Sequence, residues 1–159
     1  MLGKFENFPE IVHKEKEFKT KFSVKELQKK IIKSLYSLNG KEIRQSHITT
    51  TISSESSDYT VIFELGIADG INFNYLDASE LKRCLNFLKN RNFKTLDFLM
   101  VNRYYKIKSG KGRTPLKFDY QFLRFTFPSK CLKIMIYHER GPRRIPLDEL
   151  ISFLAKQIL

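Results

Sequence analysis

The chain has few cysteines and no long hydrophobic run. Its two cysteines, Cys84 and Cys131, lie in apolar stretches without CxxC spacing, which favours buried thiols in a reducing compartment over a disulfide or a zinc site. No segment reaches the roughly 18 consecutive apolar residues of a membrane-spanning helix. Residues 1–20 contain no apolar core followed by a small-residue cleavage site. These absences predict a soluble intracellular protein that is neither secreted nor bound to a membrane.

Patterns of catalytic chemistry are also missing. The stretch 109–114 lacks the first glycine of a phosphate-binding loop, and Gly112 stands where that loop needs Ser or Thr. The three histidines show no HExxH pattern and no pairing with cysteine, so no metal site is indicated. His138 and Glu139 would offer an acid–base pair to a small nuclease, but a hydrogen-bonded turn explains them better. We therefore expect a protein without cofactor or enzymatic activity.

Positive charge is abundant and unevenly spread. The 159 residues contain 29 Lys and Arg against 17 Asp and Glu, a net charge of +12. Residues 46–80 contain no Lys or Arg and 6 acidic residues, whereas residues 81–159 contain 18 basic and 5 acidic residues, or 18 − 5 = +13. Such a charge attracts polyanions, of which nucleic acid is the commonest. The alternative is a solvated lysine-rich surface with no ligand.

The composition and the apolar pattern predict one folded domain with helices. Apolar residues make up 42% of the chain and aromatic residues 13%, too much for a disordered basic tail. A capping box over 23–26 predicts a helix that continues to Leu38 along an apolar stripe. The residues 77–80 predict a second helix of the same kind, and Pro146 predicts the start of a third. Residues 1–22 show no period and are expected to form an N-terminal arm.

Alternating apolar residues predict antiparallel strands between these helices. The expected strands cover residues 47–52, 59–67, 71–75, 94–108, 118–127 and 131–138. The expected fold is therefore α+β, with curved antiparallel sheet packed against about three helices in a single domain of residues 23–159. The halves 46–92 and 93–159 both place strands before a helix. They would fit a duplicated strand-strand-strand-helix unit, although two capped helices alone would give the same match.

The segment from Leu132 to Leu154 combines a strand, a basic turn over 139–144, an Ile-Pro step and an amphipathic helix. This order resembles the Whirly, transcriptional coactivator and Pur group, whose members bind single-stranded DNA or RNA on a curved antiparallel sheet. The resemblance is one of topology over the last two thirds of the chain. It implies that a sheet face rich in aromatic and basic groups holds the nucleic acid. The helix over 23–38 and the acidic first half depart from the family.

Strand alternation also identifies a candidate binding face without that resemblance. One side of each C-terminal strand interleaves rings with cations, and basic turns flank the strands. Bases stack on rings and cations neutralise phosphates, so this combination suits a single-stranded nucleic acid. A plain hydrophobic core is the alternative explanation of the rings. The predicted binding residues are Tyr104, Lys106, Lys108, Lys111, Arg113, Tyr120, Phe122, Arg124, Lys133, Tyr137, Arg140, Arg143 and Arg144.

Two functional hypotheses follow from these observations. The first is a non-catalytic module that binds single-stranded DNA or RNA and acts as a homodimer or within a complex. The second is an interaction subunit whose apolar and basic face docks on an acidic protein partner. Competition between an oligonucleotide and that partner would discriminate between the two hypotheses.

Overall fold

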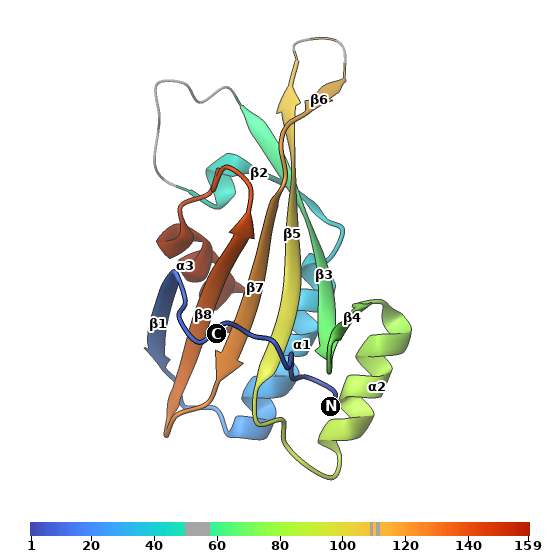
Figure 1. Cartoon of the computed structure of the whole chain (residues 1–159), viewed down its shortest axis with the longest axis vertical. Coiled ribbons are helices and arrows are strands. Elements are labelled where there is room, and N and C mark those ends of the chain that lie inside the picture. Colours follow the sequence, from blue (N-terminus) through green and yellow to red (C-terminus); the bar gives the residue numbers. More distant parts are fainter. Residues whose placement is uncertain (50–57, 109, 111) are drawn as a thin grey trace.

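The computed structural model describes residues 1–49, 58–108, 110 and 112–159, and it shows a curled sheet with helices along one side (Figure 1). The strands pair in the order β1-β8-β7-β5-β3-β2, with β4 on β3 and β6 on β5, and all pairings are antiparallel. The predicted α+β class is confirmed. In chain order the elements are β1 (Lys14–Lys19), α1 (Val24–Leu38), β2 (Glu42–Arg44), the 3₁₀ turn η1 (Gln45–His47), β3 (Tyr59–Asp69), β4 (Asn72–Tyr75), α2 (Ala78–Leu88), β5 (Leu96–Ile107), β6 (Arg113–Pro115), β7 (Asp119–Thr126), β8 (Cys131–Arg140) and α3 (Leu147–Ile158).

The helices begin where their capping residues predict. The Glu26 amide donates to Ser23 Oγ at 3.2 Å, and Ser23 Oγ donates to the Glu26 carboxylate at 3.0 Å. The Glu80 amide donates to Asp77 Oδ1 at 2.9 Å at the start of α2. Each helix turns an apolar stripe to the core, with Leu27, Ile31 and Leu35 of α1 at most 1% exposed. No helix in the described ranges is long and apolar enough to cross a membrane.

Three short strands were not expected from the sequence. The strand β1 is highly charged and exposed, and its backbone pairs with β8 at the edge of the sheet. The strands β2 and β6 have three residues each, too few for an alternating pattern. The prediction of a strand from His47 is wrong at its start, because residues 45–47 form the turn η1. The rest of that predicted strand, from Thr50 onwards, lies outside the described residues.

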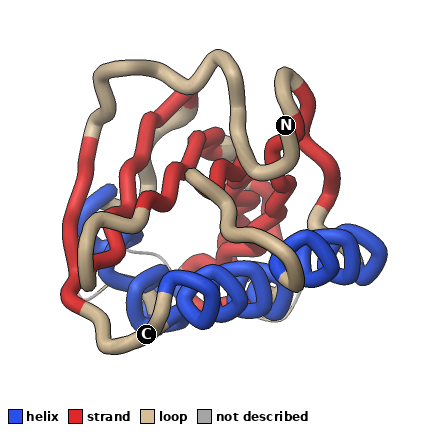
Figure 2. The backbone as a smooth tube through the Cα atoms, turned by 90° about the horizontal axis from the view of Figure 1, so that it is seen from below, coloured by secondary structure: helices blue, strands red, loops and turns tan. Residues whose placement is uncertain are grey.

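The sheet has an inner face, which the helices cover, and an outer face. Phe63, Phe98 and Phe125 lie on the inner face, are 0% exposed, and form the core with the leucines and isoleucines of α1 and α3. Figure 2 shows the helices on one side of the strands and a loop crossing on the other side. That loop belongs to the N-terminal segment 1–13, which therefore forms a third layer on the outer face.

A buried carboxylate organises the polar end of the inner face. Asp119, which is 1% exposed, accepts hydrogen bonds from the Tyr104 hydroxyl at 2.6 Å and from the backbone amides of Arg143 and Arg144 at 2.7 and 2.9 Å. The His138 ring lies 3.1 Å from the same carboxylate. These bonds satisfy a charge that would be costly to bury alone. They also fasten the turn after β8 against the start of β7, with Gly141 directly above Asp119.

We predict that Gly141→Ala destabilises the fold far more than Gly112→Ala. Both glycines have positive φ, +113° and +67°, but a methyl group at 141 would overlap the Phe118 carbonyl and lie 2.8 Å from Asp119 Cα, whereas open space surrounds Gly112. Urea denaturation should show a loss of about 3 kcal/mol or more at position 141 and of about 1 kcal/mol at position 112. Equal losses would mean that the turn does not pack tightly on Asp119.

Candidate functional site

The N-terminal segment covers the lower part of the outer face. The Phe5 ring packs against the rings of Phe73 and Phe122, with centroids 4.8 and 5.0 Å away. At the other end of the crossing, the His13 ring lies 4.6 Å from that of Tyr137, and His13 Nδ1 accepts a hydrogen bond from the His138 amide at 2.9 Å. Phe122 and Tyr137 do face outward, as predicted, but their rings lie against this segment.

Two predicted cations are engaged within the fold. Arg124 donates from Nε and Nη2 to both carboxylate oxygens of Asp97, at 2.8 Å each, and the Phe8 ring lies 4.1 Å from its guanidinium. Asp97 is 0% exposed and accepts a third bond from the Phe5 amide at 2.7 Å. Lys133 pairs with Glu15 of β1 at 3.1 Å. Arg124 thus anchors the N-terminal segment, and its guanidinium is already neutralised.

The prediction that Tyr104 shares a face with Tyr120 and Tyr137 is wrong. Tyr104 is 0% exposed on the inner face, and its hydroxyl is bonded to Asp119 and Asn102. Burial, together with the nearby Asp119 charge, raises the pKa of Tyr104. Tyr104 belongs to the even-numbered side of β5, and that is the side that the helices cover.

Three more of the predicted binding residues are paired on the outer face, turned inward or outside the described residues. Arg113 is bonded to Glu42 of β2 and lies over the Tyr105 ring, with 4.3 Å between guanidinium and centroid. Arg144 turns inward, since its Nε atom is buried and its guanidinium lies 5.4 Å from the Tyr104 ring. Lys111 lies outside the described residues.

The upper part of the outer face carries a pair that the segment leaves uncovered. Tyr120 of β7 is partly exposed, and the Arg140 guanidinium of β8 lies 4.3 Å from the centre of its ring. A β-bulge brings the two together: Gln121 pairs with His138, but Tyr120 pairs with Arg140 and not with Glu139. The bulge therefore replaces an acidic neighbour of Tyr120 with a cation, the kind of re-aiming for which bulges are used beside functional sites.

A second ring on the same face was missed by the sequence reasoning. Tyr105 of β5 is partly exposed, and Arg103 Nη1 donates to its hydroxyl at 2.8 Å. Arg103 also pairs with Glu64 at 2.7 Å. Arg103 could have identified this side of β5 as the outer one. An arginine is almost never fully buried without a partner, whereas an asparagine such as Asn102 can be buried. Hereafter the open patch means Arg103, Tyr105, Arg113, Tyr120 and Arg140.

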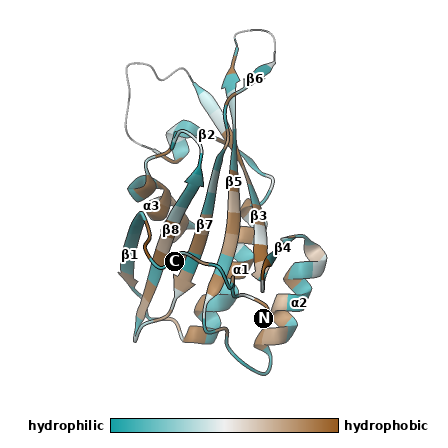
Figure 3. Cartoon of the chain, in the orientation of Figure 1, coloured by the Kyte–Doolittle hydropathy of each residue, from teal (hydrophilic) through white to brown (hydrophobic). Residues whose placement is uncertain are grey.

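Exposed cations without acidic partners lie at the same end of the sheet as the open patch. Lys106, Lys108 and Arg143 are exposed, and none of them forms an ion pair with a described residue. Figure 3 shows a hydrophilic strand β6 and a hydrophilic upper end of β8, above a hydrophobic lower part of β5. By strand alternation Lys106 points to the same side of β5 as Tyr104, so these cations flank the end of the sheet and do not all lie on its outer face.

The residues considered for catalysis do not converge. The His138 ring is on the inner face, 8% exposed and held by Asp119, and His13 lies against the outer-face ring of Tyr137. Burial raises the pKa of Cys84 to about 12, which keeps its thiol protonated. Among the described residues, no three His, Cys, Asp or Glu side chains form a group that could hold a metal ion. Comparison of the chain with protein families, curated proteins and solved structures finds no match.

We predict that Arg124→Ala lowers the free energy of unfolding by about 3 to 5 kcal/mol, because it leaves the buried Asp97 carboxylate unpaired. The matched control is Lys133→Ala, which removes the more exposed pair with Glu15 and should cost about 1 kcal/mol or less. Both values come from urea denaturation at pH 7. Similar small losses in the two variants would contradict an anchoring role for Arg124.

We predict a pH-dependent contribution from His13. Desolvation by the neighbouring groups, followed by the charges of Arg143 and His138, lowers the pKa of His13 in the folded state. The unfolded chain then binds more protons between the folded pKa and the usual value of about 6.5, so this contribution is lost as the pH falls below about 6.5. The variant His13→Asn keeps an acceptor but does not titrate. Its stability relative to wild type should rise between pH 7.5 and 5.5, and a constant difference would contradict the assignment.

Proposed function

We propose that the chain binds nucleic acid, single strands in preference to duplexes, through the open patch. The observation that carries this proposal is the bulge in β8, which sets Arg140 over the Tyr120 ring on a surface that the N-terminal segment leaves free. A tyrosine face accepts a base by stacking, and an arginine beside it neutralises the phosphate that follows. The proposal does not rest on the family resemblance.

The spacing of the two rings supports a strand lying along β5. Tyr120 pairs with Val101, and Tyr105 is four residues further along the same strand on the same face. At about 3.3 Å per residue the two rings are about 13 Å apart. Arg103 lies between them. The rings therefore offer two separate stacking positions, which an unpaired strand with accessible bases can use and a closed duplex cannot.

Exposed cations at the same end of the sheet add to the electrostatic attraction. They are Lys106, Lys108 and Arg143, and Lys106 points to the opposite side of β5 from Tyr105. Neutralised phosphates release counterions, so affinity should fall with salt concentration. The open patch itself carries three arginines, but Arg103 and Arg113 are paired with Glu64 and Glu42. Arg140 is therefore the cation of the patch that contributes most to phosphate contact.

We predict that Tyr120→Ala and Tyr105→Ala each weaken binding of a labelled oligothymidylate by about five- to 100-fold, since a stacked base is worth about 1 to 3 kcal/mol. Tyr120→Phe should bind normally because it keeps the ring. The matched control is Tyr104→Phe. Tyr104 precedes Tyr105 in the chain but points to the inner face, so this variant should lose stability without losing affinity. Fluorescence anisotropy gives the affinities. Normal binding by both alanine variants would exclude the open patch.

We also predict that Arg140→Ala makes the salt dependence of binding less steep. Removal of one phosphate contact to a single strand should reduce the slope of log K against log salt by about 0.7. Lys82→Ala, on the exposed side of α2, is the control and should leave the slope unchanged. Equal slopes for wild type and Arg140→Ala would show that Arg140 does not contact phosphate.

A further inference from the structure

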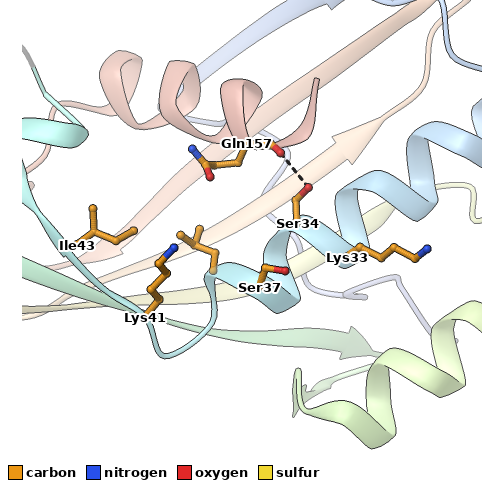
Figure 4. A pocket seen from close by; sticks show the side chains of 7 residues that line it. Lys33, Ser34, Ser37, Lys41, Ile43 and Gln157 are labelled. Carbon is orange, nitrogen blue, oxygen red and sulfur yellow. Dashed lines mark hydrogen bonds between the residues drawn. The ribbon is translucent and has the colours of Figure 1, made fainter.

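A second surface lies at the β2 edge of the sheet, between β2, α1 and α3. Two adjoining hollows of about 290 and 550 Å³ share Lys41, Ile43 and Gln157 in their lining. The Ser34 hydroxyl donates to the Gln157 backbone oxygen at 2.9 Å and joins α1 to α3 beside the smaller hollow (Figure 4). The two hollows form one groove, here called the β2 groove.

The β2 groove runs along the edge of a strand. The larger hollow is lined by Lys41 and by all three residues of β2, although successive strand side chains point to opposite faces. A hollow that meets every residue in a row borders the strand edge. The strand β2 is the last in the sheet order, with β3 as its partner among the described strands. Its other edge therefore presents backbone groups to the groove.

The charge of the groove is positive. Lys41 and Arg44 are exposed and form no ion pair with a described residue. The acidic residue between them, Glu42, already accepts hydrogen bonds from Thr60 and Arg113. Figure 4 shows Lys41 and the Gln157 side chain directed towards each other across the hollow, while Lys33 points away from it.

The floor of the groove is apolar and suits an aliphatic side chain. Ile43 is partly exposed, and Leu38 and Phe153 lie beside it at 4% and 7% exposure. The Phe153 ring is too buried for a base to lie flat on it, in contrast to the tyrosines of the open patch. A strand edge, two cations and an apolar floor together match an extended peptide that carries carboxylates on both sides of an aliphatic residue.

We propose that the β2 groove binds an acidic, extended segment of a partner protein, which adds to the sheet as a strand beside β2. Backbone hydrogen bonds to β2 hold the segment, its carboxylates lie near Lys41 and Arg44, and its aliphatic side chain contacts Ile43. This surface shares no residue with the open patch, although Glu42 in its lining pairs with Arg113 of that patch.

The test uses a labelled nine-residue peptide with a central Glu-Thr-Val-Glu segment, titrated with the full chain in a fluorescence anisotropy experiment. In an added strand the first glutamate shares the face of the valine, as Lys41 shares the face of Ile43, and the second glutamate lies on the face of Arg44. We expect saturable binding with a Kd of about 100 μM or tighter. The double variant Lys41→Glu/Arg44→Glu should weaken it by about tenfold or more, because like charges then face each other. The matched control Lys82→Glu/Lys89→Glu reverses two exposed charges at α2 and should bind within about twofold of wild type.

Three further binding experiments identify what occupies the β2 groove. A peptide N-methylated at alternate residues should bind at least tenfold more weakly if strand addition is correct, and equal binding would overturn it. The same peptide with lysine in place of both glutamates should bind more weakly, and equal binding would overturn the charge argument. Oligothymidylate should not displace the acidic peptide. If the oligonucleotide does displace the peptide, and if Arg44→Glu abolishes oligonucleotide binding, the groove is a nucleic-acid surface and the peptide proposal fails. If only Tyr120→Ala loses oligonucleotide binding, the proposed nucleic-acid site is the open patch and the peptide proposal stands.

Discussion

The buried ion pair of Asp97 and Arg124 determines which part of the outer face is available. Asp97 accepts two bonds from Arg124 and one from the Phe5 amide, so the charge that stabilises the arginine also fixes the N-terminal segment across the strands. Without the segment, the rings of Phe122 and Tyr137 would face solvent. With it, the lower part of the face becomes a second apolar layer, and the rings of the upper part stay accessible.

A second buried carboxylate shapes that accessible part from the inner side. Asp119 holds the backbone of Arg143 and Arg144, so the turn after β8 has a fixed position. The bulge lies just before this turn and changes the partner of Tyr120 from Glu139 to Arg140. The arrangement on the outer face thus depends on hydrogen bonds made on the inner one. The remaining cations at this end of the sheet are exposed to solvent, so their charges change the free energy of unfolding little.

The sequence predicted which side of a strand faces outward only where charged and apolar residues alternate clearly along it. The outer sides of β7 and β8 were identified correctly, because Arg124 and Lys133 alternate with aliphatic or aromatic residues on both strands. In β5 both sides contain apolar residues, and the choice of Tyr104 over Tyr105 was wrong. Three features could not be predicted, since each depends on contacts between residues far apart in the chain. They are the bulge, the anchoring of Arg124 by Asp97, and the pairing of β1 with β8 and of β2 with β3.

Amide chemical-shift mapping with oligothymidylate tests the central claim most directly, because it locates the bound strand without any substitution. The account predicts that the largest shifts fall on Tyr105, Tyr120 and Arg140, with smaller shifts at Lys106 and Arg143. Amides of α1 and α3 should not move. Shifts confined to the helices, or a complete absence of shifts at saturating oligonucleotide and low salt, would contradict it.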